Sequence, residues 1–383
     1  MSVTNTLTDL IPTIYDARDV VSRELIGFIP AVDLDANSNR AAKDQVIRRG
    51  IAPAVTSSTF APAMATPDGT GQTMTNATLS IDTVETVEIP WTGEQRLSLN
   101  EAGIDRYLSQ QFAQAMRTLT NKVDLAIAAR YNLASRAYGD GGTNPFASTL
   151  ADTAQLRKIL SDNGAPLSDL QLVIDTTAGA ALRTLGQLTK ANEAGDMTLL
   201  RQGKLLDVHG FAIRESAQVK QLVTSGTASS ATTNSAGYAI GATTITLASA
   251  GTGTILAGDV IRFTGHDDQY VVKTGDTDVS NGGTIVLAAP GLRVALAASA
   301  IDITVEEAST RSMAFARSAI GAAIRAPARG NDAATDIMLV ADPVSGITFD
   351  VARYAGYGME QYSVGLAWGT VVWKPEHIAL LLG

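Results

Sequence analysis

The sequence predicts an α+β protein built from several parts, and three observations carry this prediction. Apolar residues recur every three to four positions through one long stretch, polar and apolar residues alternate through several short stretches, and glycine-rich turns separate them. The chain has 383 residues, which corresponds to roughly two to three domains. With 45% apolar and 17% charged residues, a chain of this size is expected to bury a sizeable core without covalent cross-links.

The composition excludes several classes of function. The chain has no cysteine and three histidines, which rules out disulfides, thiolate metal sites and a cysteine nucleophile and disfavours a histidine-rich metal centre. Its net charge of −9 argues against binding nucleic acid through the phosphates. The uncharged tract over 221–258 is too rich in Gly, Ser and Thr for a membrane helix. The start of the chain lacks a secretory signal, so we expect synthesis in a cytoplasm.

Residues 1–50 are expected to form an N-terminal arm with one helical stretch over 14–28. Four basic residues follow this stretch, and they either contact an acidic partner or nucleic acid or form a solvated turn, which we favour because surface clusters of charge are common. The cluster consists of Arg40, Lys43, Arg48 and Arg49.

Residues 51–96 predict a long, protruding β-hairpin. A Pro-Asp-Gly turn signal marks its tip, and the segment after the tip alternates apolar and polar residues, as a strand with one wet face does. Because a two-stranded ribbon is at best marginally stable alone, we expect a neighbouring subunit to cover its apolar side. The predicted self-association residues are Pro67, Asp68, Gly69, Leu79, Ile81 and Trp91.

The clearest pattern predicts one long amphipathic helix over 98–138. Ser98 and Glu101 have the spacing of a capping box, and GDGG at 139–142 ends the pattern. A helix of this length spans about 60 Å, more than a compact domain needs. Its apolar residues recur at helical spacing and are Ile104, Leu108, Phe112, Met116, Leu119, Val123 and Ile127.

The remainder of the chain predicts a mixed domain interrupted by a β-rich insertion. Residues 150–222 suggest helices over 152–162 and 177–188 and extended segments over 170–175 and 208–216. Several short strands separated by Gly, Asp and Asn then fill 223–307, which predicts a small inserted β-barrel or sandwich. After the insertion, the mixed pattern of helices and strands returns. It predicts a helix or strand over 313–327 and strands towards the C-terminus.

We find no catalytic constellation in the sequence. Phosphate-binding, zinc-protease, serine-hydrolase and calcium-loop motifs are absent. His266 with Asp267 and Asp268 suits a turn better than a metal site, and Glu306 and Glu307 point to opposite faces of a strand, so they cannot act as an acid/base pair. No cofactor and no enzymatic activity are therefore expected.

Three segments, in this order and spacing, resemble a known family. They are GKLLDVHGFAIRES at 203–216, SMAFARSAIGAAIRAP at 312–327 and YSVGLAWGTVVWKPEHIALLLG at 362–383. The sequence resembles tailed-bacteriophage major capsid proteins of the HK97 fold, and within them the P22 coat-protein family. The resemblance covers essentially the whole chain.

The resemblance implies names and boundaries for the parts. Residues 1–50 would be the N-arm and 51–96 the extended E-loop. The peripheral domain would comprise 97–149 and 308–344 with the spine helix 98–138, the axial domain 150–222 and 345–383, and the insertion domain 223–307. No motif matches the Lys–Asn cross-link of some HK97-fold capsids, so that chemistry is not expected.

The resemblance also implies a function. Copies would assemble into the hexamers and pentamers of an icosahedral head around double-stranded DNA, in the host cytoplasm, with a separate scaffolding protein and a portal. The acidic balance would keep the wall from holding DNA by its phosphates. An encapsulin-like compartment shell is the nearest alternative. A secreted β-rich adhesin and an unrecognised hydrolase are more remote ones, opposed respectively by the missing signal and long helix and by the scarcity of histidine.

Overall fold

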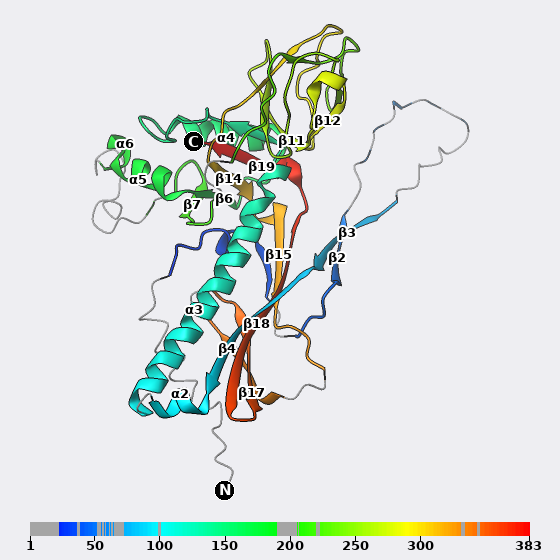
Figure 1. Ribbon diagram of the computed structural model, residues 1–383. Coiled ribbons are helices and arrows are strands. Elements are labelled where there is room, and N and C mark those ends of the chain that lie inside the picture. The colour runs from blue at the N-terminus through cyan, green and yellow to red at the C-terminus, as the bar shows by residue number, and fades with distance from the viewer. Residues whose placement is uncertain are drawn as a thin grey trace.

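The computed structural model shows an elongated molecule with two sheets, one long helix and a protruding ribbon (Figure 1). It describes residues 23–36, 39–51, 73–98, 101–189, 207–219, 223–330, 334–342 and 345–383, together with 55, 57, 59, 60, 62, 64 and 205.

The long helix α3 spans Glu101–Ala128, so it is shorter than predicted. A 3₁₀ turn, η3 (Ala129–Leu133), follows it, and strand β5 (Arg136–Tyr138) replaces the predicted last turns. β5 pairs with two strands from distant parts of the chain, one on each side. This ladder of hydrogen bonds outweighs the local helical preference, which is worth only tenths of a kcal/mol per residue.

The capping box also differs from the prediction. Ser98 is the last residue of a short helix, α2 (Gly93–Ser98), rather than the cap of the long one. The reciprocal box lies at the start of α2. There Gln95 N–H donates to Thr92 Oγ1 at 3.3 Å, and Thr92 N–H donates to Gln95 Oε1 at 3.1 Å.

A six-stranded sheet forms the lower half of the molecule in Figure 1, with α3 lying along it. Its longest strand, β18, pairs with β15, with β17 and with β4. The main core lies between α3 and this sheet. The strands are β1 (Asp33–Ala36), β4 (Thr83–Thr92), β15 (Ile320–Arg325), β16 (Ala334–Ala341), β17 (Thr348–Gly356) and β18 (Met359–Val372).

The second sheet begins with four strands in the order β7, β6, β14, β19, after which come β5 and the strands of 223–307. The core beneath them also includes helices α4, α5 and α6. The strands are β6 (Leu170–Ile174), β7 (Phe211–Glu215), β14 (Arg311–Ala316) and β19 (Ile378–Leu382), and the helices are α4 (Ala151–Asp162), α5 (Thr176–Thr184) and α6 (Gly186–Thr189). The elements predicted over 150–222 are thus confirmed, with the second helix divided.

The sheets group the C-terminal segments differently from the predicted division. β14 lies within 308–344 but pairs with β6 of the 150–222 segment. β17 and β18 lie within 345–383 but belong to the other sheet, and only β19 returns to β14. The division of 308–383 at residue 344 is therefore wrong: the chain crosses between the sheets at 317–319 and again at 373–377.

Residues 223–307 have a core of their own, made of side chains from within this segment. Strand pairing runs in the order β8, β13, β10, β11, β12, β9, and the two ends meet where Thr233 bridges Leu247. The strands thus form a closed circuit, and β11 also pairs with β5 of the body. The strands are β8 (Ala231–Thr232), β9 (Thr244–Thr246), β10 (Val260–Phe263), β11 (Gln269–Thr274), β12 (Thr284–Leu287) and β13 (Asp302–Val305).

The N-terminal segment is fastened to α3. Of the predicted helix over 14–28, only 23–28 is described, and these residues are not helical. The buried Asp124 carboxylate accepts hydrogen bonds at 3.0 Å from the backbone N–H groups of both Phe28 and Ile29. It also accepts one from Ser216 Oγ at 2.6 Å, so one side chain joins three segments that are distant in sequence.

Candidate assembly surface

A two-stranded ribbon projects from the body beside the six-stranded sheet (Figure 1). It consists of β2 (Gln45–Ile51), β3 (Thr75–Ile81) and the described residues between them, and we refer to the described residues of 45–81 as the ribbon. β2 and β3 pair in antiparallel register from Gln45 opposite Ile81 to Ile51 opposite Thr75. The predicted hairpin is therefore confirmed in outline, but its first strand begins before residue 51. Its second strand ends at Ile81, because β4 belongs to the body sheet.

The base of the ribbon packs on its own chain. Leu79 and Ile81 are buried against a small cluster that includes Ala323 and Ala367 of the body sheet. Trp91 lies beyond the ribbon on β4, buried in the main core, and its Nε1 donates to Gln111 Oε1 at 2.9 Å. The prediction that a neighbour must cover these three side chains is thus wrong. The alternating pattern indicated a buried face but not which chain buries it.

Gly369 on β18 allows the ribbon to sit so close to the sheet. A Cβ at this position would lie 2.0 Å from the carbonyl oxygen of Ser80 on β3. Only glycine permits two backbones to approach so closely. The direction in which the ribbon leaves the body therefore depends on one glycine in a strand of another segment.

Beyond its base, the ribbon exposes large apolar side chains. Val55 is 71% exposed, Phe60 88%, Met64 109% and Met74 81%. Monomeric proteins rarely display so many large apolar groups on one projection, and such groups mark interaction surfaces. Sequence reasoning missed these residues and placed the apolar side of the hairpin on Leu79, Ile81 and Trp91 instead. The predicted tip residues Pro67, Asp68 and Gly69 lie outside the described residues.

The basic cluster before and on β2 is divided between structure and solvent. Arg40 Nη2 donates to the fully buried Asp350 carboxylate at 2.9 Å, so it is a structural residue. Arg49 pairs with Asp33 at 3.2 Å and lies over the Trp373 ring at 5.9 Å. Lys43 and Arg48 are exposed, and they fit the predicted solvated cluster.

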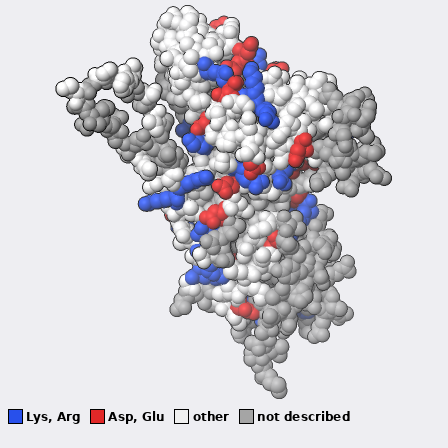
Figure 2. All heavy atoms as spheres, turned by 180° about the vertical axis from the view of Figure 1, so that it is seen from behind, with Lys and Arg blue, Asp and Glu red and all other residues white. Residues whose placement is uncertain are grey.

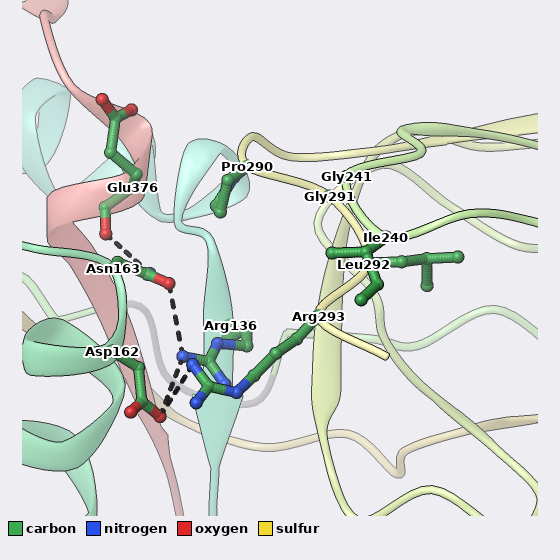
Figure 3. Close-up of a pocket in the computed structure, with 10 residues that line it drawn as sticks. All are labelled: Arg136, Asp162, Asn163, Ile240, Gly241, Pro290, Gly291, Leu292, Arg293 and Glu376. Carbon is green, nitrogen blue, oxygen red and sulfur yellow. Dashed lines mark hydrogen bonds and ion pairs between the residues drawn. The ribbon is translucent and has the colours of Figure 1, made fainter. Parts of the chain in front are cut away.

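A cavity of about 360 Å³ lies where residues 223–307 meet the body (Figure 3). Arg136 and Arg293 both reach the Asp162 carboxylate at the end of α4, at 3.5 and 3.1 Å, and Arg136 also pairs with Asp268 at 2.9 Å. Asn163 Nδ2 donates to the carbonyl oxygen of Glu376 at 2.8 Å. Both arginines are thus matched by carboxylates, and the site joins the two parts of the fold.

A second polar cluster lies where the chain leaves the body at 223 and returns at 309, two residues that form a bridge. Arg311 is 1% exposed, and burial lowers its pKa. Asp259 and Glu306 lie near it, and burial raises the pKa of both carboxyls. Asp259 is held by Leu256 N–H at 2.6 Å and by Gly226 N–H at 3.0 Å. Asp259 thus fastens the start of the segment through Gly226, and Arg311 donates a hydrogen bond to Ser309 Oγ at its end.

Catalytic chemistry finds little support in the described residues. His209 Nδ1 lies 2.6 Å from Thr153 Oγ1, but its left-handed backbone, at φ 51°, places it in a tight turn. Burial lowers the pKa of His377. Within the described ranges, no three His, Asp or Glu side chains gather as a metal site would require. None of the described helices is long and apolar enough to cross a membrane.

Charges of both signs are interspersed on the face shown in Figure 2. A protein that binds along a nucleic-acid backbone displays a continuous basic groove. The described residues of that face form no such groove (Figure 2).

Comparison with known proteins gives no match among family models or among curated proteins. Solved structures do match. The bacteriophage PhiM1 mature capsid superposes with a TM-score of 0.50 and 10% identity, over 94% of this chain and 88% of that chain. A structure of Mycobacterium phage Che8 gives 0.48 and 14%, over 90% and 88%. The virus-like particle from Pyrococcus furiosus gives 0.43 and 9%, over 98% of both chains.

This chain has the fold of a phage capsid protein. The match to the PhiM1 capsid chain covers 94% of this chain. At 10% identity this likeness concerns the fold, which is mixed α+β with few helices, and function has to be argued from the surfaces of this chain.

Proposed function

We propose that this protein is the major capsid protein of a tailed bacteriophage. Copies of it assemble into hexamers and pentamers of an icosahedral head that encloses double-stranded DNA, with a separate scaffolding protein and a portal taking part. The fold is of the HK97 type, and the three sequence segments around 203–216, 312–327 and 362–383 favour the P22-like group. The protein acts as a structural component of the virion and breaks no bond.

The observation that carries this proposal is the ribbon, on a fold shared with the PhiM1 capsid. It displays Val55, Phe60, Met64 and Met74 to solvent, while Leu79 and Ile81 bury its base against the body. Covering one such side chain contributes about 1.5–3 kcal/mol. In a closed shell every copy both gives and receives a ribbon, so this modest contribution recurs at every contact.

Residues 223–307 act as an inserted β-barrel domain in this proposal. Their closed circuit of strands and separate core support this assignment. Between 223 and 306, seven acidic residues outnumber three basic ones, which suits an outer solvated face or an interface with a basic patch. The pairing of β11 with β5 and the ion pairs of Arg136 and Arg293 fix this domain to the body.

Assembly tests the proposal directly. We expect the expressed protein to form rings or shells in negative-stain electron microscopy, with closed particles more frequent when a cognate scaffolding protein is co-expressed. Phe60→Asp is expected to prevent assembly, because it places a charge at a position that a neighbouring copy would cover. The subunit should still fold, because Phe60 is exposed in the single chain. Val46→Asp, on the exposed side of the ribbon base, is the matched control and is expected to assemble. A monomer under all conditions would refute the proposal.

The packaged DNA gives an independent test. With a net charge of −9, isolated subunits are expected to bind double-stranded DNA weakly even at low salt, because few phosphate counterions are released. Tight binding at low ionic strength would contradict the proposed acidic inner wall.

An encapsulin-like shell is the alternative within the same fold. It would capture a cargo peptide and assemble without a scaffold or DNA. Particles that form alone and retain a cargo enzyme through its terminal peptide would favour that alternative.

A further inference from the structure

The methionines that the structure describes differ widely in exposure. Met64 and Met74 lie on the ribbon and are 109% and 81% exposed, whereas Met116 and Met313 are fully buried in the main core. Met359 is 40% exposed and lies at the β17–β18 hairpin, away from the ribbon. Two of the most exposed thioethers of the described chain thus lie on the projection proposed to contact a neighbour.

A thioether is the one group in the described ribbon that a mild oxidant converts from apolar to polar. The sulfur attacks one oxygen of a peroxide, the O–O bond breaks, the sulfur takes the oxygen as a sulfoxide and water leaves. Sulfur is oxidised by two electrons and the peroxide is reduced by two. The product is polar and stiffer, and it disrupts apolar contacts.

We propose that Met64 and Met74 form an oxidation-sensitive site that controls whether a free subunit can assemble. The inference rests on the proposed function, because it takes a second copy as the surface that covers the ribbon. Peroxide converts both side chains to sulfoxides while the subunit is free, and the contact they make in the shell protects them afterwards. The chain has no cysteine, so thiol oxidation does not compete with this reaction.

The test treats free subunits and assembled particles with hydrogen peroxide and locates sulfoxides by peptide mass spectrometry. In free subunits we expect Met64 and Met74 to oxidise about tenfold faster than Met116 and Met313, because oxidation follows exposure. In assembled particles we expect the rates at Met64 and Met74 to fall towards those of the buried pair. The inference would be overturned if Met64 and Met74 oxidised as fast in assembled particles as in free subunits.

The second readout is assembly itself. Oxidised wild-type subunits are expected to assemble about tenfold less than untreated ones, and methionine sulfoxide reductases should restore assembly. A Met64→Leu, Met74→Leu double variant keeps the side-chain volume and should assemble equally before and after peroxide, although Met359 is still present. Met359→Leu is the matched control and should remain sensitive. A double variant that loses assembly after peroxide would overturn the inference.

The two proposals fail differently. If untreated subunits assemble and peroxide changes nothing, the oxidation site is refuted and the capsid function stands. If untreated subunits never assemble, the proposed function is refuted and this inference with it.

Discussion

The substitution Gly369→Ala tests how the ribbon is set on the body. The new Cβ would lie 2.0 Å from the Ser80 carbonyl oxygen, whereas such contacts essentially never fall below 3.0 Å. Either the strands must separate by about 1 Å, which costs about 1–3 kcal/mol as overpacking does, or the ribbon base must detach. Detachment exposes Leu79 and Ile81 at about 1.5–3 kcal/mol each. Because shifting costs less, we expect a loss of about 1–3 kcal/mol in the free energy of unfolding.

Two measurements separate these routes. Urea unfolding followed by tryptophan fluorescence gives the global cost, and limited trypsin digestion reports the ribbon, where Arg48 and Arg49 follow each other. We expect faster cleavage at these arginines than in the wild type, because a shifted β3 loosens the hold of the body on β2.

Gly50→Ala on β2 is the matched control. Gly50 is also a strand glycine, but the nearest atom to its added Cβ is 3.9 Å away, at Asn76 Oδ1. Alanine there should be neutral or stabilise by up to about 1 kcal/mol, because glycine weakens strands. If Gly369→Ala proved as stable and as resistant to trypsin as Gly50→Ala, the argument from backbone approach would be refuted.

Three further substitutions follow from the contacts. Asp350→Ala removes the buried carboxylate with which Arg40 and Arg329 both form ion pairs and should cost about 3–5 kcal/mol in urea unfolding; a loss below 1 kcal/mol would contradict a structural role. Hydrogen bonds from Arg117 lower the pKa of Glu24 to about 2 from 4.5, so its stabilising contribution is complete above pH 4.5 and is lost as the pH falls towards 2. Glu24→Gln should flatten the stability profile in that window, and an unchanged profile would refute the assignment. Thr92→Ala removes the cap of α2 and should cost about 1 kcal/mol, whereas Thr92→Ser should not.

Local patterns of the sequence specified the elements whose stability is local. The apolar spacing through Leu108, Phe112 and Val123 placed α3, since one helical face must be buried and its period is 3.6 residues. The elements over 150–222 were also predicted from local patterns, and the change of composition at 221 indicated that a different, β-rich segment follows. The candidate surface was predicted only in part: the ribbon was expected, but its exposed apolar residues were not, since Val55, Phe60 and Met64 follow no period.

Only the tertiary structure decided which strands pair and which segment covers a buried face. Leu79 and Ile81 alternate with polar residues whether their own sheet or a neighbour covers them, and it is Gly369, nearly 300 residues away in sequence, that admits the ribbon. Residues 136–138 pair with a strand more than 200 residues later, and this pairing ends the long helix. By itself, the sequence determined the periodicity of each segment and the chemistry that the chain lacks. The tertiary structure decided which segments meet, because hydrogen bonds between strands depend on partners that no local pattern names.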